Sequence, residues 1–290
     1  MLDVIKSSPI EKISLAGASL FLKRDDLLHP DFSGNKARKF YYYLTHDFPS
    51  VHTLISWGSI QSNAMYSLSV LAKLKGWEFR YYVHHIPDYL KQHPHGNYFY
   101  ALENGMRVIV GEVPPLVESK GILSIPEGGA IEESSEGIAL LAKEILQWKA
   151  TLLLKKCAIF LPSGTGTTAL FLQRYLLDDC VYTTPCVGDE AYLKKQFTQL
   201  EAQQTLHPTI LTPPKKYHFG KLYEEHYRLW LDAKKETGVT FDLLYDPLGL
   251  RVMLDAYEDF SLPLVYIHQG GLKGNESMLP RYERKYPTLF

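Results

Sequence analysis

Residues 157–168 read Cys-Ala-Ile-Phe-Leu-Pro-Ser-Gly-Thr-Gly-Thr-Thr. The apolar start of this stretch predicts a buried strand that leads directly into a glycine-rich loop, and a helix is expected at residues 168–177. In such a loop, consecutive backbone N–H groups converge at a helix start, which favours an anion. An ordinary strand-to-helix turn would explain the loop equally well. The stretch lacks the lysine of a P-loop and the glycine spacing of a dinucleotide site.

Predicted strands and helices alternate on both sides of this stretch. Strands are expected at residues 20–23, 53–57, 78–83, 107–110 and 264–268, and helices at 36–44, from 62–63 onward, at 133–148 and at 220–237. This alternation predicts an α/β fold with a largely parallel sheet. Residues 116–129 are rich in glycine and proline, which predicts a connection between domains.

The segment Ser33-Gly34-Asn35-Lys36-Ala37-Arg38-Lys39 predicts a tight turn that delivers a lysine to a helix start, with Asn35 as the cap. Basic residues at a helix start oppose the helix dipole and cost stability unless an anion binds there. A lysine that attacks an aldehyde must be a neutral amine, which requires burial or a nearby positive charge. A solvated basic patch is the alternative interpretation.

A third segment, Gly58-Ser59-Ile60-Gln61-Ser62-Asn63, follows a predicted strand and opens a helix. Its free N–H groups and polar side chains suit a carboxylate or the phenolic oxygen of a cofactor ring. Alternatively, Ser62 or Asn63 simply caps the helix. A reactive lysine, a polar helix start and a glycine-rich anion loop together indicate an aldehyde cofactor that carries a phosphate. Pyridoxal 5′-phosphate (PLP) is such a cofactor.

Composition and charge narrow the class of protein. The chain has 290 residues and a net charge of −1, so we expect no nucleic-acid partner. It has no apolar run long enough to span a bilayer, no secretory signal at its start, and too few cysteines for a disulfide framework. We therefore expect a cytoplasmic protein with no membrane partner. We also expect no metal, because His84, His85, His93 and His95 lack thiol or carboxylate neighbours at ligand spacing.

In their order and spacing, these motifs resemble the ACC (1-aminocyclopropane-1-carboxylate) deaminase and D-cysteine desulfhydrase family. This family lies within the tryptophan-synthase-β-like, fold type II PLP-dependent enzymes. The resemblance covers most of the chain and rests on residues 23–27, 34–39, 61–63, 163–168 and 268–271. It implies two parallel-sheet α/β domains with the cofactor in the cleft between them. Residues 1–37 and 125–290 would form the large domain, residues 38–124 a small inserted domain, and the protein would be a homodimer.

The resemblance implies roles at the cofactor. Lys36 would form an aldimine with PLP, and Lys39 would reach the phosphate. Asn63 would hydrogen-bond the phenolic oxygen, and Asp246 would face the pyridine nitrogen, where an acid strengthens the electron sink. Asp246 is otherwise a turn residue before Pro247. Five loop residues would wrap the phosphate: Ser163, Gly164, Thr165, Gly166 and Thr167.

On the substrate side, the resemblance makes Ser62 and Tyr245 catalytic groups together with the lysine. Ser62 would hold the substrate carboxylate beside Asn63 and take part in proton movement, and Tyr245 would face the substrate. Two further substrate positions depart from the family. Phe219 stands where a second tyrosine is expected, and Gln269 matches neither the leucine of the deaminases nor the threonine of the desulfhydrases.

Two more departures follow Tyr245. Asp246 is acidic, like the glutamate of the deaminases, but shorter, and residues 248–250 replace the usual Gly-Lys. These changes leave the cofactor residues intact and alter the substrate side. The resemblance therefore implies a PLP-dependent lyase or deaminase that converts a small amino acid to ammonia and a 2-oxoacid. D-cysteine would give pyruvate, ammonia and sulfide, whereas ACC would give 2-oxobutyrate and ammonia. A non-catalytic or repurposed PLP-binding protein is the alternative, and a structural protein without cofactor is a third.

Overall fold

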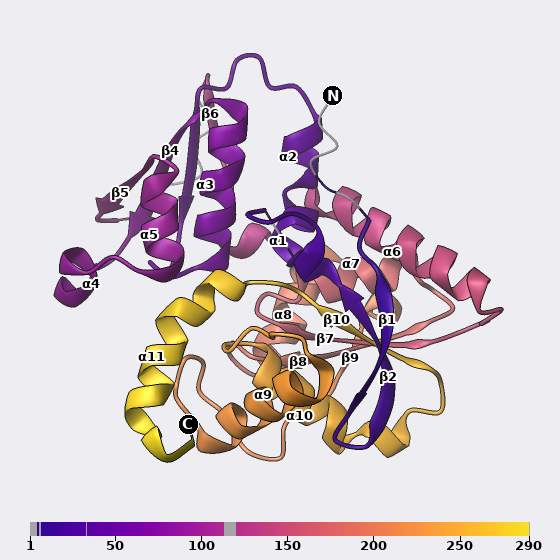
Figure 1. Cartoon of the computed structure of the whole chain (residues 1–290). Helices are drawn as coiled ribbons and strands as arrows, with labels where there is room; N and C mark the ends of the chain where they lie inside the picture. The colour runs from indigo at the N-terminus through magenta and orange to yellow at the C-terminus, as the bar shows by residue number, and fades with distance from the viewer. Residues whose placement is uncertain (1–4, 6, 33, 113–119, 290) are drawn as a thin grey trace.

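Two β-sheets organise the chain in the computed structural model, which describes residues 5, 7–32, 34–112 and 120–289 (Figure 1). Ser33, the first residue of the lysine segment, and residues 116–119 of the expected connection lie outside the described residues. One sheet has the strand order β1-β2-β10-β7-β8-β9 and the other the order β5-β4-β3-β6. Within both sheets neighbouring strands are parallel, except that β1 pairs antiparallel with β2.

The larger sheet comprises β1 (Ile10–Leu15), β2 (Ala18–Arg24), β7 (Ala158–Ser163), β8 (Cys180–Pro185), β9 (Thr209–Ile210) and β10 (Leu264–His268). The smaller sheet comprises β3 (Thr53–Trp57), β4 (Glu78–Val83), β5 (Met106–Val110) and β6 (Ile122–Ser124). In chain order, the whole small sheet lies between β2 and β7. The predicted domain boundaries at residues 37 and 125 agree with this order, and they stay a prediction.

Helices connect these strands. The α-helices are α1 (Gly34–Lys39), α2 (Tyr41–Thr45), α3 (Asn63–Lys75), α4 (Asp88–Gln92), α5 (Gly96–Glu103), α6 (Ser134–Thr151), α7 (Thr167–Tyr175), α8 (Glu190–Leu200), α9 (Glu224–Thr237), α10 (Asp246–Asp255) and α11 (Asn275–Lys285). Short 3-10 helices are η1 (Asp25–Leu27), η2 (Glu127–Gly129), η3 (Gln204–Leu206), η4 (Tyr257–Asp259), η5 (Leu272–Gly274) and η6 (Pro287–Leu289). Among the described residues, no helix combines the length and apolar character needed to cross a membrane.

The apolar run that ends at the glycine-rich loop is buried on both faces of the large sheet. Ala158 and Phe160 belong to a core shared with residues of α9, α10 and α11. Ile159 and Leu161 belong to a second core shared with residues of α6 and α7. Because successive side chains of a strand point to opposite faces, a strand covered by helices on both sides must be apolar throughout. Figure 1 shows the two helix layers on either side of the sheet.

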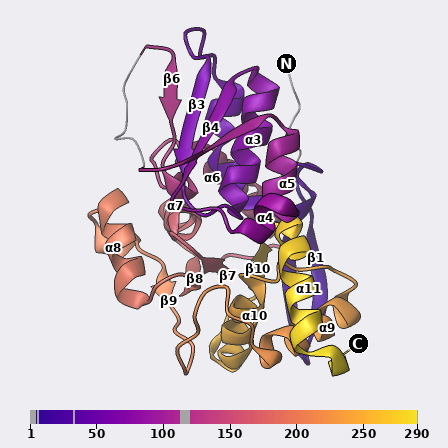
Figure 2. The same ribbon diagram turned by 90° about the vertical axis from the view of Figure 1, so that its left-hand side faces the viewer.

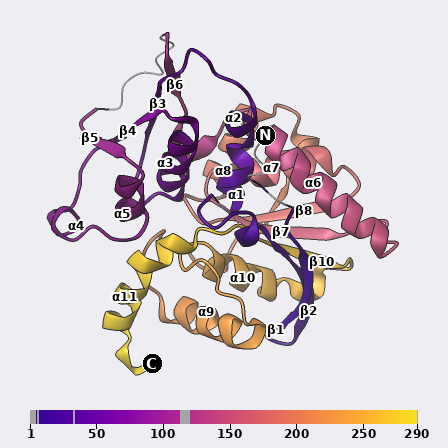
Figure 3. The same ribbon diagram turned by 45° about the horizontal axis from the view of Figure 1, so that its top comes forward.

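The small sheet has its own core, in which Leu54 and Phe79 from the strands pack with Met65 and Leu68 of α3. Figure 2 shows α3 and α5 beside β3 and β4. Figure 3 shows α11, near the end of the chain, reaching α5, so the last long helix contacts the small-sheet layer. The start of α3, which follows β3, approaches Gly271, which follows β10, so the carboxyl ends of these two strands lie close together.

The predicted helix at residues 36–44 is wrong as a single helix. Helix α1 ends at Lys39 and α2 begins at Tyr41, because Phe40 between them leaves the regular helical conformation (φ −100°, ψ 9°). Asn35 is the second residue of α1 and therefore does not cap it. By contrast, β3 and β10 have the predicted bounds, and Ser62 caps α3 as the capping interpretation of that segment expects.

Candidate active site

The start of α1 is fixed against the end of β10. Gly34 has φ +66°, and a Cβ atom there would overlap the carbonyl oxygen of Gln269. The Asn35 N–H donates to the same oxygen (3.0 Å). Only glycine can adopt this backbone conformation without strain at such a close approach. The turn therefore delivers the following lysine to the carboxyl edge of the large sheet, where ligands collect in open α/β sheets.

The two lysines of this turn converge on one carbonyl oxygen. Lys36 Nζ donates to Gly128 O at 3.1 Å, and Lys39 Nζ donates to the same oxygen at 3.0 Å. Lys39 Nζ also donates to Thr165 Oγ1 (3.3 Å) in the glycine-rich loop. Burial lowers the pKa of Lys36 to about 8, against an opposing effect of the Glu127 carboxylate. Burial, and then the charge of Lys36, lower the pKa of Lys39 well below its usual range.

The glycine-rich loop presents hydroxyls and helix N–H groups beside these lysines. Gly166 precedes α7 with φ +72°, and the hydroxyls of Thr165 and Thr167 are hydrogen-bonded to each other (3.0 Å). The Ser163 hydroxyl bonds that of Thr183 (2.6 Å). The buried Thr168 Oγ1 has no hydrogen-bond partner within the described part of the chain. A buried hydroxyl without a partner at a helix N-terminus is a donor awaiting an acceptor.

The donors gathered here fit a phosphate group. Lys39 is 2% exposed, yet its ammonium contacts only neutral oxygens, and neither lysine forms an ion pair with any described residue. A buried cation without a counter-charge is costly, so an anion at this position would relieve the cost. Lys39, Thr165 and Thr168 would donate to it together with the first N–H groups of α7.

The third motif lies at the start of α3. Ser62 Oγ accepts from the N–H groups of Ala64 (3.1 Å) and Met65 (3.4 Å), and the Ser62 hydroxyl also interacts with the Tyr81 phenol. Asn63 Oδ1 accepts from Asn97 Nδ2 (2.7 Å). Its Nδ2 faces Gly271, where a Cβ atom would lie only 2.6 Å from it. A hydroxyl and an amide N–H thus stand at the start of α3, where they suit an oxygen-rich ligand.

Asp246 is buried (1% exposed) in a closed hydrogen-bond network. Its Oδ1 accepts from the Tyr266 hydroxyl (2.7 Å) and its Oδ2 from the Asp242 N–H (2.9 Å). His268 Nδ1 lies 3.7 Å from Oδ2, and that ring donates through Nε2 to Thr240 O (2.9 Å). Burial raises the pKa of Asp246. Both oxygens already have donors, and the predicted contact with a ring nitrogen stays a prediction.

Asp242 is a second buried carboxyl beside Asp246. Its Oδ1 accepts from the N–H groups of Leu244 (2.8 Å) and Tyr245 (2.6 Å). Its buried Oδ2 has no hydrogen-bond partner among the residues described. Burial, and then the neighbouring Asp246, raise the pKa of Asp242 to about 8. Asp242 is therefore mostly protonated at neutral pH, which lets two carboxyls share one buried site.

The substrate-side residues divide into two groups. The Tyr245 hydroxyl approaches Gly164 of the loop, where a Cβ atom would lie 3.5 Å from it, and the ring packs on Phe219 with centroids 5.1 Å apart. The Gln269 amide is engaged at both ends, because Nε2 donates to Pro162 O (2.6 Å) and Oε1 accepts from Asn35 Nδ2 (3.1 Å). Tyr245 faces the loop, whereas Gln269 ties three segments of backbone together.

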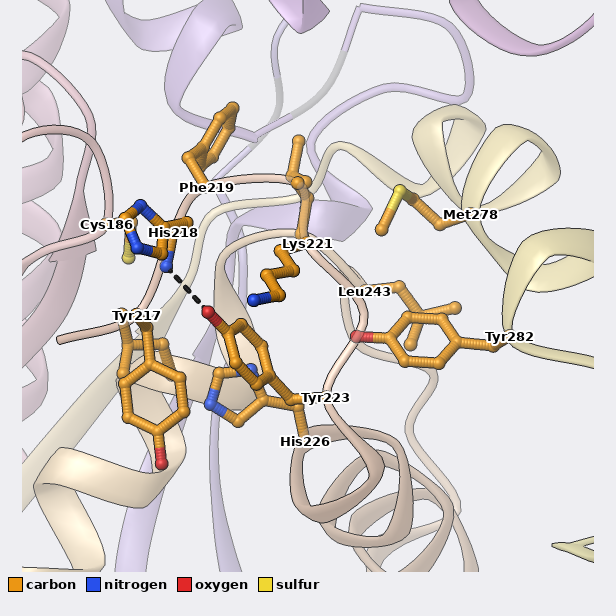
Figure 4. A pocket seen from close by; sticks show the side chains of 13 residues that line it. Cys186, Tyr217, His218, Phe219, Lys221, Tyr223, His226, Leu243, Met278 and Tyr282 are labelled. Carbon is orange, nitrogen blue, oxygen red and sulfur yellow. Dashed lines mark hydrogen bonds between the residues drawn. The ribbon is translucent and has the colours of Figure 1, made fainter. Parts of the chain in front are cut away.

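Phe219 is also one of the residues that line a pocket (Figure 4). It is lined mainly by the segment that precedes and opens α9, together with Cys186, Leu243 and Tyr282. Of the predicted site residues, its lining includes only Phe219. Burial lowers the pKa of His226 in this lining to about 4, so the imidazole is neutral. Phe219 lines the pocket and packs on Tyr245, which approaches Gly164 of the glycine-rich loop. Neither Lys36 nor Lys39 lines the pocket.

Sequence reasoning missed several site residues. Gly128 holds both lysines, Glu127 adds a carboxylate beside them, and Asp242 stands next to Asp246. Gly128 and Gly129 belong to a glycine- and proline-rich segment, but that composition predicted only a connection between domains and no contact with the lysines. In the described part of the chain, no group of three or more His, Cys, Asp or Glu side chains could hold a metal ion.

Comparisons with known proteins give matches of fold. No protein-family model matches the chain, and no curated protein matches it. Solved structures do. An ACC deaminase homologue has a TM-score of 0.80 at 20% identity, over 99% of this chain and 95% of that one.

Two further structures match at lower identity. A hydrogen sulfide-producing enzyme from Fusobacterium nucleatum has a TM-score of 0.66 at 14% identity, covering 93% of this chain and 97% of that one. A pyridoxal 5′-phosphate-dependent aspartate racemase has a TM-score of 0.63 at 14% identity, covering 92% and 91%. The chain has the fold of these enzymes, so the expected α/β fold with parallel sheets is confirmed.

Proposed function

We propose that the chain is a PLP-dependent lyase or deaminase that acts on a small amino acid, as a member of the ACC deaminase and D-cysteine desulfhydrase family. The observation that carries the proposal is the pair of lysines on Gly128 O, beside a glycine-rich loop and without an anionic partner among the described residues. One lysine suits the aldehyde of the cofactor and the other its phosphate. The shared fold with PLP-dependent enzymes supports this assignment.

When bound, PLP supplies an electron sink that stabilises negative charge at the α-carbon of an amino acid. Lys36 holds the aldehyde end, because its lowered pKa makes the neutral amine accessible near neutral pH. Lys39, Ser163, Thr165 and the start of α7 bind the phosphate. Gly164 and Gly166 leave the backbone free to approach it.

The substrate would lie between α3 and Tyr245. Ser62 would donate its hydroxyl proton to the substrate carboxylate, and Asn63 would bind an oxygen of the cofactor ring or of the carboxylate. Tyr245 faces the substrate from the opposite side, backed by Phe219. Lys36, once released, moves the α-proton. A D-cysteine-like or an ACC-like substrate, each with one water, would then yield ammonia and a 2-oxoacid.

A second candidate is a non-catalytic PLP-binding protein of the same fold. The specific observation in its favour is that Gln269 and Asp246, both expected to face the ligand, have their polar atoms engaged by the protein itself. Such a protein would bind the cofactor and turn over neither amino acid. Cytoplasmic location and a homodimer stay predictions for either candidate.

The visible absorption spectrum of the purified protein with PLP tests the proposal. We expect an absorption band from cofactor bonded to protein, which Lys36→Ala abolishes and Lys143→Ala, an exposed lysine of α6, keeps. Borohydride reduction followed by peptide mass spectrometry should locate the label on Lys36. Ketoacid with D-cysteine alone would assign desulfhydration, and ketoacid with ACC alone would assign ring opening. A band without turnover of either favours the second candidate, and no band overturns both.

A further inference from the structure

Glu127 stands beside the lysine site, and no role has been assigned to it above. It is the first residue of η2, directly before Gly128, whose carbonyl oxygen accepts from Lys36 and Lys39. The backbone at Glu127 is therefore held within one peptide unit of both ammonium groups. Its side chain is exposed to solvent.

The Glu127 carboxylate lies next to Gly58. A Cβ atom on Gly58 would lie 2.7 Å from Glu127 Oε1 and 2.8 Å from the Tyr81 hydroxyl. Gly58 begins the loop that connects β3 to α3, in which Ser62 and Asn63 stand. The Glu127 carboxylate thus lies between Gly128 O, which accepts from both lysines, and the loop before α3 that would bind substrate.

The charge of the Glu127 carboxylate acts on Lys36. Apart from burial, Glu127 is the only group among the described residues that shifts the pKa of Lys36, and it favours the ammonium form. Lys39 faces Lys36 from the next turn of α1. The phenols of Tyr81, Tyr192 and Tyr245 also face Glu127; burial raises their pKa values first, and Glu127 adds to each shift.

A lysine in this position needs a proton acceptor. Its nitrogen must be a free amine to bond a carbonyl carbon, and the ammonium form prevails at neutral pH. Gly128 O cannot take the proton, because it is a backbone carbonyl that already accepts from both lysines. In the described part of the chain, Glu127 makes no hydrogen bond or ion pair that would hold its side chain elsewhere, so it is free to turn toward Lys36.

We propose that Glu127 is the acid–base partner of Lys36. Its carboxylate takes the proton that the ammonium loses when the nitrogen bonds a carbonyl carbon and the carbonyl oxygen leaves as water. It returns a proton when that bond is broken. Only a proton moves between the two side chains, so no oxidant or reductant is needed. The need for this transfer rests on the proposed function, whereas the coupling between the two side chains does not.

The coupling is measured on the protein without cofactor. Limiting acetic anhydride labels free amines, and peptide mass spectrometry gives the fraction of Lys36 labelled from pH 6 to pH 10. In the wild type, half-maximal labelling is expected near pH 8. In Glu127→Gln, the midpoint should fall by about 0.5 to 1 pH unit, because the Lys36 ammonium loses the longer-range attraction of the Glu127 carboxylate. Glu127→Asp, which keeps the charge, should restore most of the shift.

Glu133→Gln is the matched control, because Glu133 is an exposed carboxylate of the same connection and precedes α6. Its labelling curve should coincide with that of the wild type. Identical curves for Glu127→Gln and the wild type would overturn the proposal, as would an equal shift in Glu133→Gln. Unchanged thermal unfolding of the variants would show that the fold is intact.

A second arm separates this proposal from the proposed function. With PLP added, the pH profile for the rate at which the visible band appears should move in Glu127→Gln as the labelling curve does. If no variant gives a band, the proposed function fails, and the labelling curves still decide whether Glu127 governs Lys36. A band whose pH profile is unchanged in Glu127→Gln would overturn the proton transfer while leaving PLP binding intact.

Discussion

Lys39 shows most directly how a ligand site differs from a structural one at the scale of a residue. A buried ammonium that contacts only Gly128 O and Thr165 Oγ1 has lost its hydration without gaining a counter-charge. In a purely structural role, a carboxylate would be expected nearby. The neighbouring Arg38, also buried, illustrates the difference, since it is paired with Asp25 and Glu144.

The first prediction follows from this contrast. Lys39→Met should leave the unfolding free energy of the unliganded protein unchanged or higher, because it removes a buried amine whose charged form is disfavoured by burial. The same variant should lose stabilisation by PLP or inorganic phosphate, which in the wild type is worth about 2.7 kcal/mol at a hundredfold excess over Kd. Thermal unfolding with and without each ligand measures both effects.

Lys143→Met, at an exposed position of α6, is the control, and it should keep the ligand effect. If Lys39→Met were strongly destabilised without ligand and still stabilised by phosphate, the lysine would be a structural residue.

Whether a candidate site residue could be predicted from the sequence depended on whether it lies in a short sequence motif. Gly34, Lys36, Lys39 and the loop from residue 163 to residue 167 could be recognised because each lies in a short motif whose backbone conformation the sequence dictates. Glu127 and Asp242 could not, since their neighbours, and the burial of Asp242, arise only when distant segments meet. The sequence motif of Ser62 was compatible with either a cap or a ligand contact, and the cap is present.

At the scale of elements, α1 is attached to the molecule by an unusually buried ion network. Arg38 donates to both oxygens of Asp25 (3.1 and 2.9 Å) and to Glu144 of α6 (2.9 and 2.7 Å). Lys23 of β2 joins the same Glu144. Because Arg38 and Lys36 share α1, this network sets the direction in which Lys36 points.

Arg38→Met should therefore be strongly destabilising. It leaves Asp25 buried without its main partner, which costs about 3–5 kcal/mol. Urea unfolding measures the loss. Arg228→Met is the control, because its pair with Glu224 is exposed and should contribute less than about 1 kcal/mol. Equal losses in the two variants would contradict the role assigned to burial.

The contact between α1 and the end of β10 makes a second element-scale prediction. Gly34→Ala should cost more than about 1 kcal/mol of stability, since the methyl group meets the Gln269 carbonyl in addition to the strain of a positive φ. Gly17→Ala isolates the strain, because Gly17 has φ +82° with no atom within 4 Å of the added Cβ. Equal unfolding free energies for the two variants would mean that the backbone gives way at Gln269.

Several strands with an uninterrupted apolar pattern could be predicted, and some elements that contain breaking residues could not. β3, β10 and the buried β7 have continuous apolar runs, which follow from burial on both faces. Helices α10 and α11 escaped prediction because they contain Pro247 and Pro280, which the tertiary packing tolerates. Strand β8 was missed because its threonines and terminal proline resemble a turn.

At the scale of the molecule, the buried carboxyls tie stability to pH. The pKa of Asp242 is raised by burial to about 8 in the folded protein, against about 3.9 in an unfolded chain. The folded state therefore holds a proton that the unfolded chain releases above about pH 4, so this group makes the protein less stable as pH rises from about 4 to about 8. The pKa of Asp246 is shifted in the same direction.

Asp242→Asn should flatten this dependence, because the amide keeps an acceptor for the N–H groups of Leu244 and Tyr245 and has no proton to lose. Urea unfolding at pH 5, 7 and 9 measures the slope. Asp255→Asn, an exposed position at the end of α10, should leave the slope as in the wild type. An unchanged slope in Asp242→Asn would place the titrating group elsewhere.

The strand order also bears on how the chain is made. β10, the last described strand to leave the ribosome, inserts between β2 and β7. The N-terminal hairpin of β1 and β2 therefore waits through nearly the whole of synthesis with one edge unpaired, and unpaired edges invite pairing with other chains. Nascent chains that stop before residue 264 should leave this hairpin open to proteases and chaperones, and the lysine turn, which rests on Gln269, should form only when translation is almost complete.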